Sequence, residues 1–397
     1  MSGFSDYRTI AKRFGAVGVE QNVYKECYTT LADFLIGLKN VELDYQYFPN
    51  REYVNEAKEY ESRISKVLSD YASTMDYQLN NLPKNMAVAL ERTMGLIGPA
   101  IEAAGRMAKD GTNIEDRQKI IIFLSDAGAF AENYAELCSI LVDNLKKFKS
   151  EGLVELDEDM KKLIETVSGS SSTYKGMKKE LQKQIDILKE TVKDCTNGAI
   201  GAGVGTGLFL VLGAVAVIAT IATAGATAPA LVVLAAAGVP CLIGAAATGF
   251  LTYEAVAAQN QIKALTAAMS DCDVAIAQLD LYGQMYDGMI GQIDSVADAV
   301  ETMGREWKML ADELEGLSKL VKDADDCTAG LKWAELEELL NSIDAAMRGL
   351  ETEINKVRID ETVVSKGSFS FEMTEEEMQK ECAEAEQVSL RRYLLSA

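Results

Sequence analysis

The chain has 397 residues, of which 48% are hydrophobic and 25% charged, and its formal net charge is −22. No basic cluster accompanies this acidity, which argues against a nucleic-acid partner and against electrostatic attraction to an anionic lipid surface. There is no histidine, so histidine bases, Ser-His-Asp and Cys-His nucleophiles and histidine-ligated metals are excluded.

The few prolines and the scattered cysteines narrow the fold class further. Five prolines leave very long stretches without a helix breaker, and strong helix formers dominate outside the centre of the chain. The seven cysteines lie far apart without a C-x-x-C pair, which favours neither a zinc site nor a disulfide framework. The sequence predicts an all-α protein without cofactor or metal.

The N-terminal half reads as a series of helices. Residues 1–17 are expected to form a loosely organised arm without the apolar core of a secretory signal peptide, so any export would follow another route. Asn50 is a suitable N-cap, and the stretch from Asn80 to Pro83 is expected to end the helix that Asn50 begins. Apolar spacing predicts helices over 19–44, 51–79, 84–109, 113–149 and 157–194.

The centre of the chain carries no charged residue between Asp194 and Glu254. Two apolar runs, 200–224 and 231–253, are each long enough to cross a bilayer as a helix, for which roughly 20 residues suffice. The short linker between them requires an antiparallel helical hairpin, with a tip at Gly225, Thr227 and Pro229. The predicted membrane-inserting residues are Leu208, Phe209, Leu210, Val211, Leu212, Val215, Val217, Ile218, Ile221, Leu231, Val232, Val233, Leu234, Leu242, Ile243, Phe250 and Leu251.

After the centre, a helix is predicted over 259–325. Its apolar residues alternate steps of three and four, the repeat of a coiled-coil seam. At about 1.5 Å per residue, such a helix predicts an elongated bundle. The expected stalk-seam residues are Leu279, Tyr282, Tyr286, Met289, Ile293, Val296, Val300, Met303, Trp307, Leu310, Leu314, Leu317 and Val321.

The C-terminal part is predicted to contain a helix over 331–357, a small β-hairpin over 362–371 around a Gly turn, and a last acidic helix from Glu375 onward. The expected domains are 1–196 (the N-terminal tail and stalk of the bundle), 197–256 (the membrane-inserting head), 257–357 (the C-terminal stalk helices) and 358–397 (the β-hairpin and acidic helix).

This combination of a long coiled-coil bundle with an uncharged hairpin resembles the cytolysin A superfamily of α-helical pore-forming toxins, which includes haemolysin BL, the non-haemolytic enterotoxin and the Xax and Yax binary cytotoxins. The likeness covers residues 18 to 357 and is one of architecture and hydropathy. It implies a secreted, soluble monomer whose head opens at a target-cell membrane, inserts its hairpin and assembles into a ring. On this sequence, the resemblance implies that the segments entering the membrane are residues 200–224 and 231–253.

Three other interpretations remain open from the residues. The hairpin can be the buried core of a purely structural coiled-coil scaffold, the chain can be a constitutive membrane protein, or it can be a secretion-system translocator or membrane tether. An enzyme has the least support, because Gly201 to Gly207 matches no phosphate-binding loop.

A polar pore lining is not visible within the hairpin. Only Thr206, Thr220, Thr223, Thr248 and Thr252 interrupt its apolar runs. We therefore expect homo-oligomers, a second toxin subunit that supplies the polar lining, or both.

Overall fold

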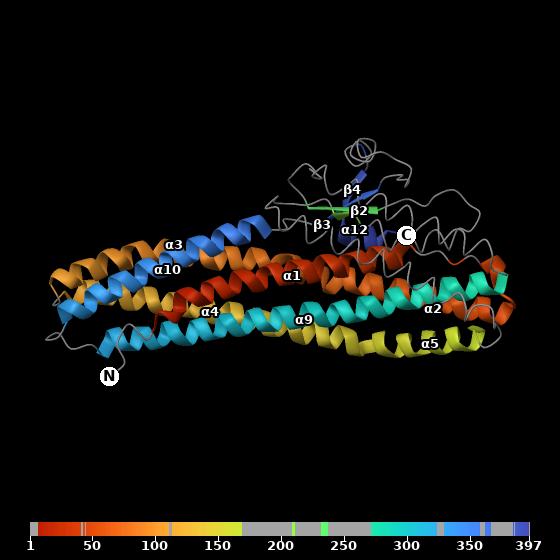
Figure 1. Cartoon of the computed structure of the whole chain (residues 1–397), viewed down its shortest axis with the longest axis horizontal. Coiled ribbons are helices and arrows are strands. Elements are labelled where there is room, and N and C mark those ends of the chain that lie inside the picture. The colour runs from red at the N-terminus through yellow and green to blue at the C-terminus, as the bar shows by residue number, and fades with distance from the viewer. Residues whose placement is uncertain are drawn as a thin grey trace. The chain divides into compact units, whose positions relative to one another are not determined.

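The structure is a computed structural model, and it describes residues 7–40, 43, 45–110, 113–168, 209–210, 232–236, 271–323, 329–357, 362–366, 384 and 386–396. The α-helices are α1 (Thr9–Asn40), α2 (Arg51–Thr74), α3 (Asp76–Lys109), α4 (Ile114–Phe148), α5 (Val154–Ser168), α9 (Asp271–Asp323), α10 (Ala329–Val357) and α12 (Leu390–Leu395) (Figure 1). A 3₁₀ turn, η2 (Tyr45–Tyr47), follows α1, and a π-helical turn, η3 (Lys149–Leu153), joins α4 to α5. The strands are β1 (Phe209–Leu210), β2 (Val232–Ala236), β3 (Thr362–Lys366) and β4 (Glu386–Ser389).

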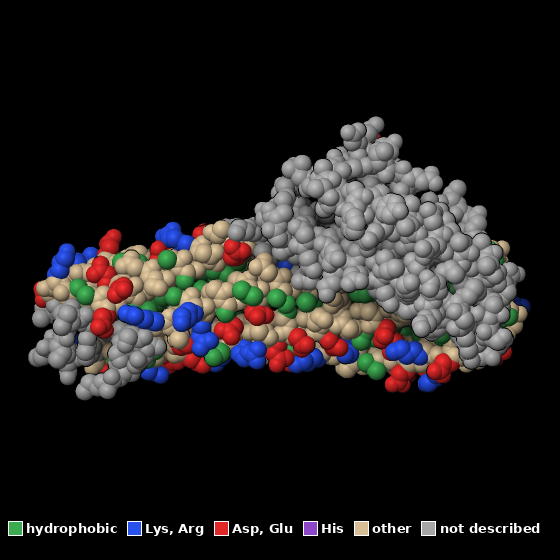
Figure 2. Space-filling model, viewed as in Figure 1, with side chains coloured by type: hydrophobic (Ala, Val, Ile, Leu, Met, Phe, Trp, Pro, Cys, Tyr) green, Lys and Arg blue, Asp and Glu red, His purple; other side chains and the backbone are tan. Residues whose placement is uncertain are grey.

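The chain divides into two compact units. The first contains residues 1–25, 81–144 and 296–358, and the second contains 26–80, 145–295 and 359–397. Long helices account for most of the described residues, as the sequence predicts. Acidic and basic side chains are interspersed along the described helices on the face shown in Figure 2. The predicted four-part functional division stays a prediction.

Within the first unit, α1 begins earlier than the sequence predicts. The prediction of a loose arm up to residue 17 is wrong from Thr9 onward, because Ile10, Phe14 and Val17 are buried. Arg13 also holds the first turns of α1 against α9. Its guanidinium reaches Glu313 at 2.6 Å and Glu306 at 3.1 Å, both on α9.

Trp307 of α9 is buried in the core of the first unit. Its ring meets Phe14 edge-on with centroids 6.4 Å apart, and meets Tyr134 at 5.0 Å. Nearby, Gly304 permits close packing of α9 against α4, since a Cβ there would lie 2.7 Å from the Cβ of Cys138. Burial raises the pKa of the Cys138 thiol to about 12, so this cysteine acts as a small packing residue.

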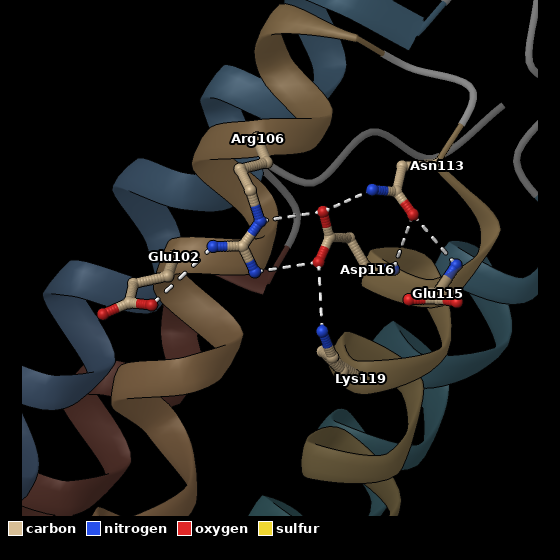
Figure 3. A network of polar contacts seen from close by, with 6 residues as sticks. All are labelled: Glu102, Arg106, Asn113, Glu115, Asp116 and Lys119. Atoms are coloured by element: carbon tan, nitrogen blue, oxygen red, sulfur yellow. Dashed lines mark hydrogen bonds and ion pairs between the residues drawn. The ribbon is translucent and has the colours of Figure 1, made fainter.

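A polar network joins the end of α3 to the start of α4 (Figure 3). The carboxylate of Asp116 accepts two hydrogen bonds from Arg106, at 2.8 and 2.9 Å, and one from the Asn113 amide at 2.8 Å. Asn113 in turn accepts backbone N–H bonds from Glu115 and Asp116, and so caps α4. The predicted end of one helix at Lys109 and the predicted start of the next near Asn113 are therefore confirmed.

The joint between α2 and α3 differs from the prediction. Asn50 caps α2 as expected, with its side chain accepting the Tyr53 N–H. The break, however, falls at Met75, and α3 continues through Pro83 and Pro99. The expectation that the chain breaks at Asn80–Pro83 is wrong, because burial of the neighbouring helix face outweighs the backbone hydrogen bond that proline removes.

In the second unit, ion pairs join α9 to the elements around it. Lys149 in η3 contacts Asp294 at 2.6 Å, and Lys161 on α5 contacts Asp287 at 3.2 Å. Tyr286 donates a hydrogen bond to the carbonyl of Leu153 at 3.3 Å, where the π-helical turn ends. These contacts hold the N-terminal part of α9 against η3 and α5.

Candidate functional site

The described residues of the uncharged centre belong to a four-stranded antiparallel sheet with strand order β1-β2-β3-β4. β1 pairs with β2 through Phe209 opposite Leu234 and Leu210 opposite Val233. β2 pairs with β3 over its whole length, from Val232 opposite Lys366 to Ala236 opposite Thr362. The sheet therefore joins the apolar centre to the C-terminal segment.

These strands correct the predicted helical hairpin. Five predicted membrane-inserting residues, Phe209, Leu210, Val232, Val233 and Leu234, lie in strands, so the helix prediction is wrong for them in this structure. β-Branched valines fit a pleated strand, and β3 supplies backbone partners that residue spacing along the centre could not reveal. The other predicted inserting residues and the tip residues Gly225, Thr227 and Pro229 lie outside the described residues.

The C-terminal segment is also partly different from its prediction. β3 confirms the predicted strand at Thr362, whereas the expected second strand at 369–371 lies outside the described residues. β3 pairs instead with β4, from Val363 opposite Ser389 to Lys366 opposite Glu386. The predicted acidic helix is thus wrong at 386–389, whereas Glu384 and Leu390–Leu395 are helical and residues 375–383 lie outside the described residues.

The short helix α12 connects the sheet to the helices of the second unit. It packs against α2, β3 and β4, and it lies beside the strands in Figure 1. Leu390, Tyr393 and Leu394 are at most 7% exposed. Ser389 caps the helix by accepting the Arg392 N–H at 3.3 Å, and Lys39 of α1 donates to the Ser396 carbonyl. The sequence does not predict these contacts, because they join residues far apart in the chain.

The thirteen predicted seam residues are all buried along α9. Those from Leu279 to Ile293 lie in the second unit, and those from Val296 to Val321 lie in the first. Burial also raises the pKa of Tyr282 and of Tyr286 well above the ordinary value of a tyrosine, so both side chains stay neutral. These residues form helix-packing core.

Two features are absent from the described part of the chain. There, no helix combines the length and the apolar character needed to span a bilayer. The same residues contain no cluster of three or more side chains suited to hold a metal ion. The runs 200–224 and 231–253 fall almost wholly outside these residues.

Comparison with solved structures shows which fold the chain adopts. Soluble SmhA of the tripartite alpha-pore forming toxin Smh from Serratia marcescens aligns with a TM-score of 0.63 and 11% identity, over 87% of this chain and 93% of SmhA. The HblL1 toxin component of Bacillus cereus gives 0.60 and 12%, over 86% and 96%. Soluble AhlB of the tripartite alpha-pore forming toxin AHL from Aeromonas hydrophila gives 0.59 and 14%, over 86% and 91%.

The predicted fold class, a bundle of long helices, is therefore confirmed: the chain adopts the helical fold of these toxin components. No protein-family model and no curated protein sequence matches it.

Proposed function

We propose that this chain is a component of a secreted α-helical pore-forming toxin, and that its uncharged centre enters the target-cell membrane. The observation that carries the proposal is the uncharged stretch between Asp194 and Glu254 in a fold otherwise shared with alpha-pore forming toxin components. An ionised side chain deep in a bilayer costs several kcal/mol, so a stretch free of charge is suited to cross one.

Insertion requires the centre to leave the sheet. A transmembrane strand needs about 9–11 residues, whereas β2 has five. As helices, the two apolar runs would each reach across the hydrocarbon core and satisfy every backbone N–H and C=O internally. We therefore propose that β1 and β2 exchange strand pairing for helical structure when they enter lipid.

The partners that we propose follow from the lack of a polar face on the hairpin. Its scattered threonines do not form the polar face that an aqueous lumen needs. The proposed complex is an oligomer in which this chain anchors in lipid and a second subunit contributes the amphipathic lining. Two of the similar structures are named as components of tripartite toxins, which supports a multi-part assembly.

Dye release from phosphatidylcholine vesicles, with and without cholesterol, tests this function. We expect the purified chain to bind vesicles, and we expect full release only when proteins encoded beside its gene are added. Full, stable conductance from this chain alone in planar bilayers would contradict the need for a partner. Neither binding nor release under any of these conditions would favour the structural scaffold, and activity only through a secretion needle would favour the translocator.

A further inference from the structure

Among the described residues, the strand β2 pairs with the C-terminal segment over a longer stretch than with β1, its neighbour in the apolar centre. Its contact with β1 covers two pairs of opposite residues, Phe209 with Leu234 and Leu210 with Val233. Its contact with β3 covers all five of its residues. Every second opposite pair of an antiparallel ladder exchanges backbone hydrogen bonds, so the longer ladder makes β3 the main partner, among the described strands, that β2 must give up on leaving the sheet.

The strand β3 is itself held by β4, and β4 leads directly into α12. β4 pairs with β3 on the side away from β2, over four residues. Ser389 ends β4 and caps α12, so no linker separates the strand from the helix. The apolar side chains of α12 are buried, and the helix packs on α2. One continuous set of contacts therefore runs from α2 through α12, β4 and β3 to β2.

The weakest contact in this series is the docking of α12 on α2. A helix of six residues has no independent stability in water, so α12 keeps its structure only while it is docked. Its docking depends on Leu390, Tyr393 and Leu394, with the hydrogen bond from Lys39 to the Ser396 carbonyl beside them. A contact of this size opens far more readily than the long helices do.

We propose that β3, β4 and α12 form an intramolecular clasp that retains the apolar centre in the protein, and that undocking of α12 from α2 releases β2. The fate of β2 after release rests on the proposed function, whereas the clasp in the soluble chain does not.

Hydrogen exchange of the full chain in solution tests the clasp without any membrane. The variant Leu394→Ala truncates a side chain that is 3% exposed, and Leu395→Ala makes the same change at a neighbour that is 46% exposed. We expect Leu394→Ala to raise exchange of the β2 amides by roughly tenfold or more, with exchange in α4 unchanged, and Leu395→Ala to leave both at the parent rate. Equal β2 exchange in the parent and both variants would overturn the clasp.

A cross-link between β2 and β3 tests the same proposal when Leu394→Ala unfolds the whole chain. Two double variants, Leu234→Cys with Val364→Cys and Ala235→Cys with Val363→Cys, place cysteines opposite each other. Opposite pairs alternate between hydrogen-bonded and non-hydrogen-bonded, so one variant presents the closer Cα separation. The seven native cysteines are replaced by serine or alanine beforehand.

With vesicles and companion proteins present, we expect the oxidised, cross-linked chain to lose at least roughly nine-tenths of the dye release. Reduction should restore it. Equal release before and after cross-linking would show that β2 does not need to leave β3, and would overturn the proposal. If the reduced chain gave no release at all, the proposed function would fail, and the exchange comparison would still decide whether the clasp exists.

Discussion

Asp116 carries most of the polar contacts that join the end of α3 to the start of α4. Its carboxylate is 2% exposed, yet Arg106, its principal partner, is 49% exposed. The hydrogen bonds from Arg106 lower the pKa of Asp116 below its ordinary value. Hydrogen bonds to charged groups are strong, but the exposure of Arg106 screens this pair, so its net contribution is modest.

We expect Asp116→Asn to lower the free energy of unfolding by about 1 kcal/mol at pH 7, as measured by urea unfolding. Glu102→Gln is the matched control, because Glu102 is 75% exposed and reaches Arg106 only at 3.7 Å. That control should change stability by less than about 0.5 kcal/mol. An equal loss in both variants would contradict the role assigned to Asp116.

The variant Asp116→Asn also tests how the stability of the chain depends on pH. Because the pKa of Asp116 is lower in the folded chain, its stabilising contribution is present above the unfolded pKa of about 4 and is lost as the pH falls through the folded value. The stability difference between the parent and Asp116→Asn should therefore shrink as the pH is lowered from about 4. A difference that stayed constant down to the acid limit of folding would show that the carboxylate charge contributes nothing.

At the level of helix packing, Gly304 determines how closely α9 approaches α4. A Cβ at Gly304 would come within 2.7 Å of the Cys138 Cβ, which belongs to the stiff base of a side chain and cannot turn aside. We expect Gly304→Ala to destabilise the chain by about 1–3 kcal/mol. Gly349→Ala in α10, where nothing lies within 4 Å, should instead stabilise it by roughly 0.5–1 kcal/mol, because alanine favours the helix. Thermal unfolding of both variants checks the opposite signs.

The elements that the sequence predicts well are those whose signal is local. The alternating steps along α9 place thirteen residues in the core, and Asn50 and Asn113 mark helix starts through their own side chains. The start of α1 is not predictable from local signals, because its early turns depend on Arg13 and its distant partners Glu306 and Glu313. The continuation of α3 through Pro83 is unpredictable for a related reason, since burial of the surrounding face is a tertiary effect.

The sheet was predictable only in part. Val363 and Val364 follow Thr362 in a pattern typical of a strand, and that strand is present. Its partners were not predictable, because pairing between Leu234 and Val364 depends on the fold rather than on either local pattern. The apolar centre was correctly singled out as uncharged, but hydropathy alone does not distinguish a strand in this structure from a membrane helix in another.

For the molecule as a whole, a single charge in the apolar centre should separate folding from membrane activity. Leu242 lies near the middle of the second apolar run, where a lysine would cost about 2.5–3.5 kcal/mol in the bilayer. We expect Leu242→Lys to reduce dye release by roughly 100-fold. Ala258→Lys adds the same charge beyond the run and should release dye at the parent rate, with circular dichroism confirming that both variants are folded. Full release by Leu242→Lys would place this residue outside the bilayer.

The transfer of the apolar centre from protein to lipid can be observed directly at Cys241. A chain that keeps only this cysteine is labelled with a polarity-sensitive dye and mixed with vesicles whose acyl chains carry bromine, in the presence of its companion proteins. The account predicts a blue shift of the emission and quenching by the brominated chains. Unchanged emission without quenching, under conditions in which the companions release dye together with this chain, would contradict it.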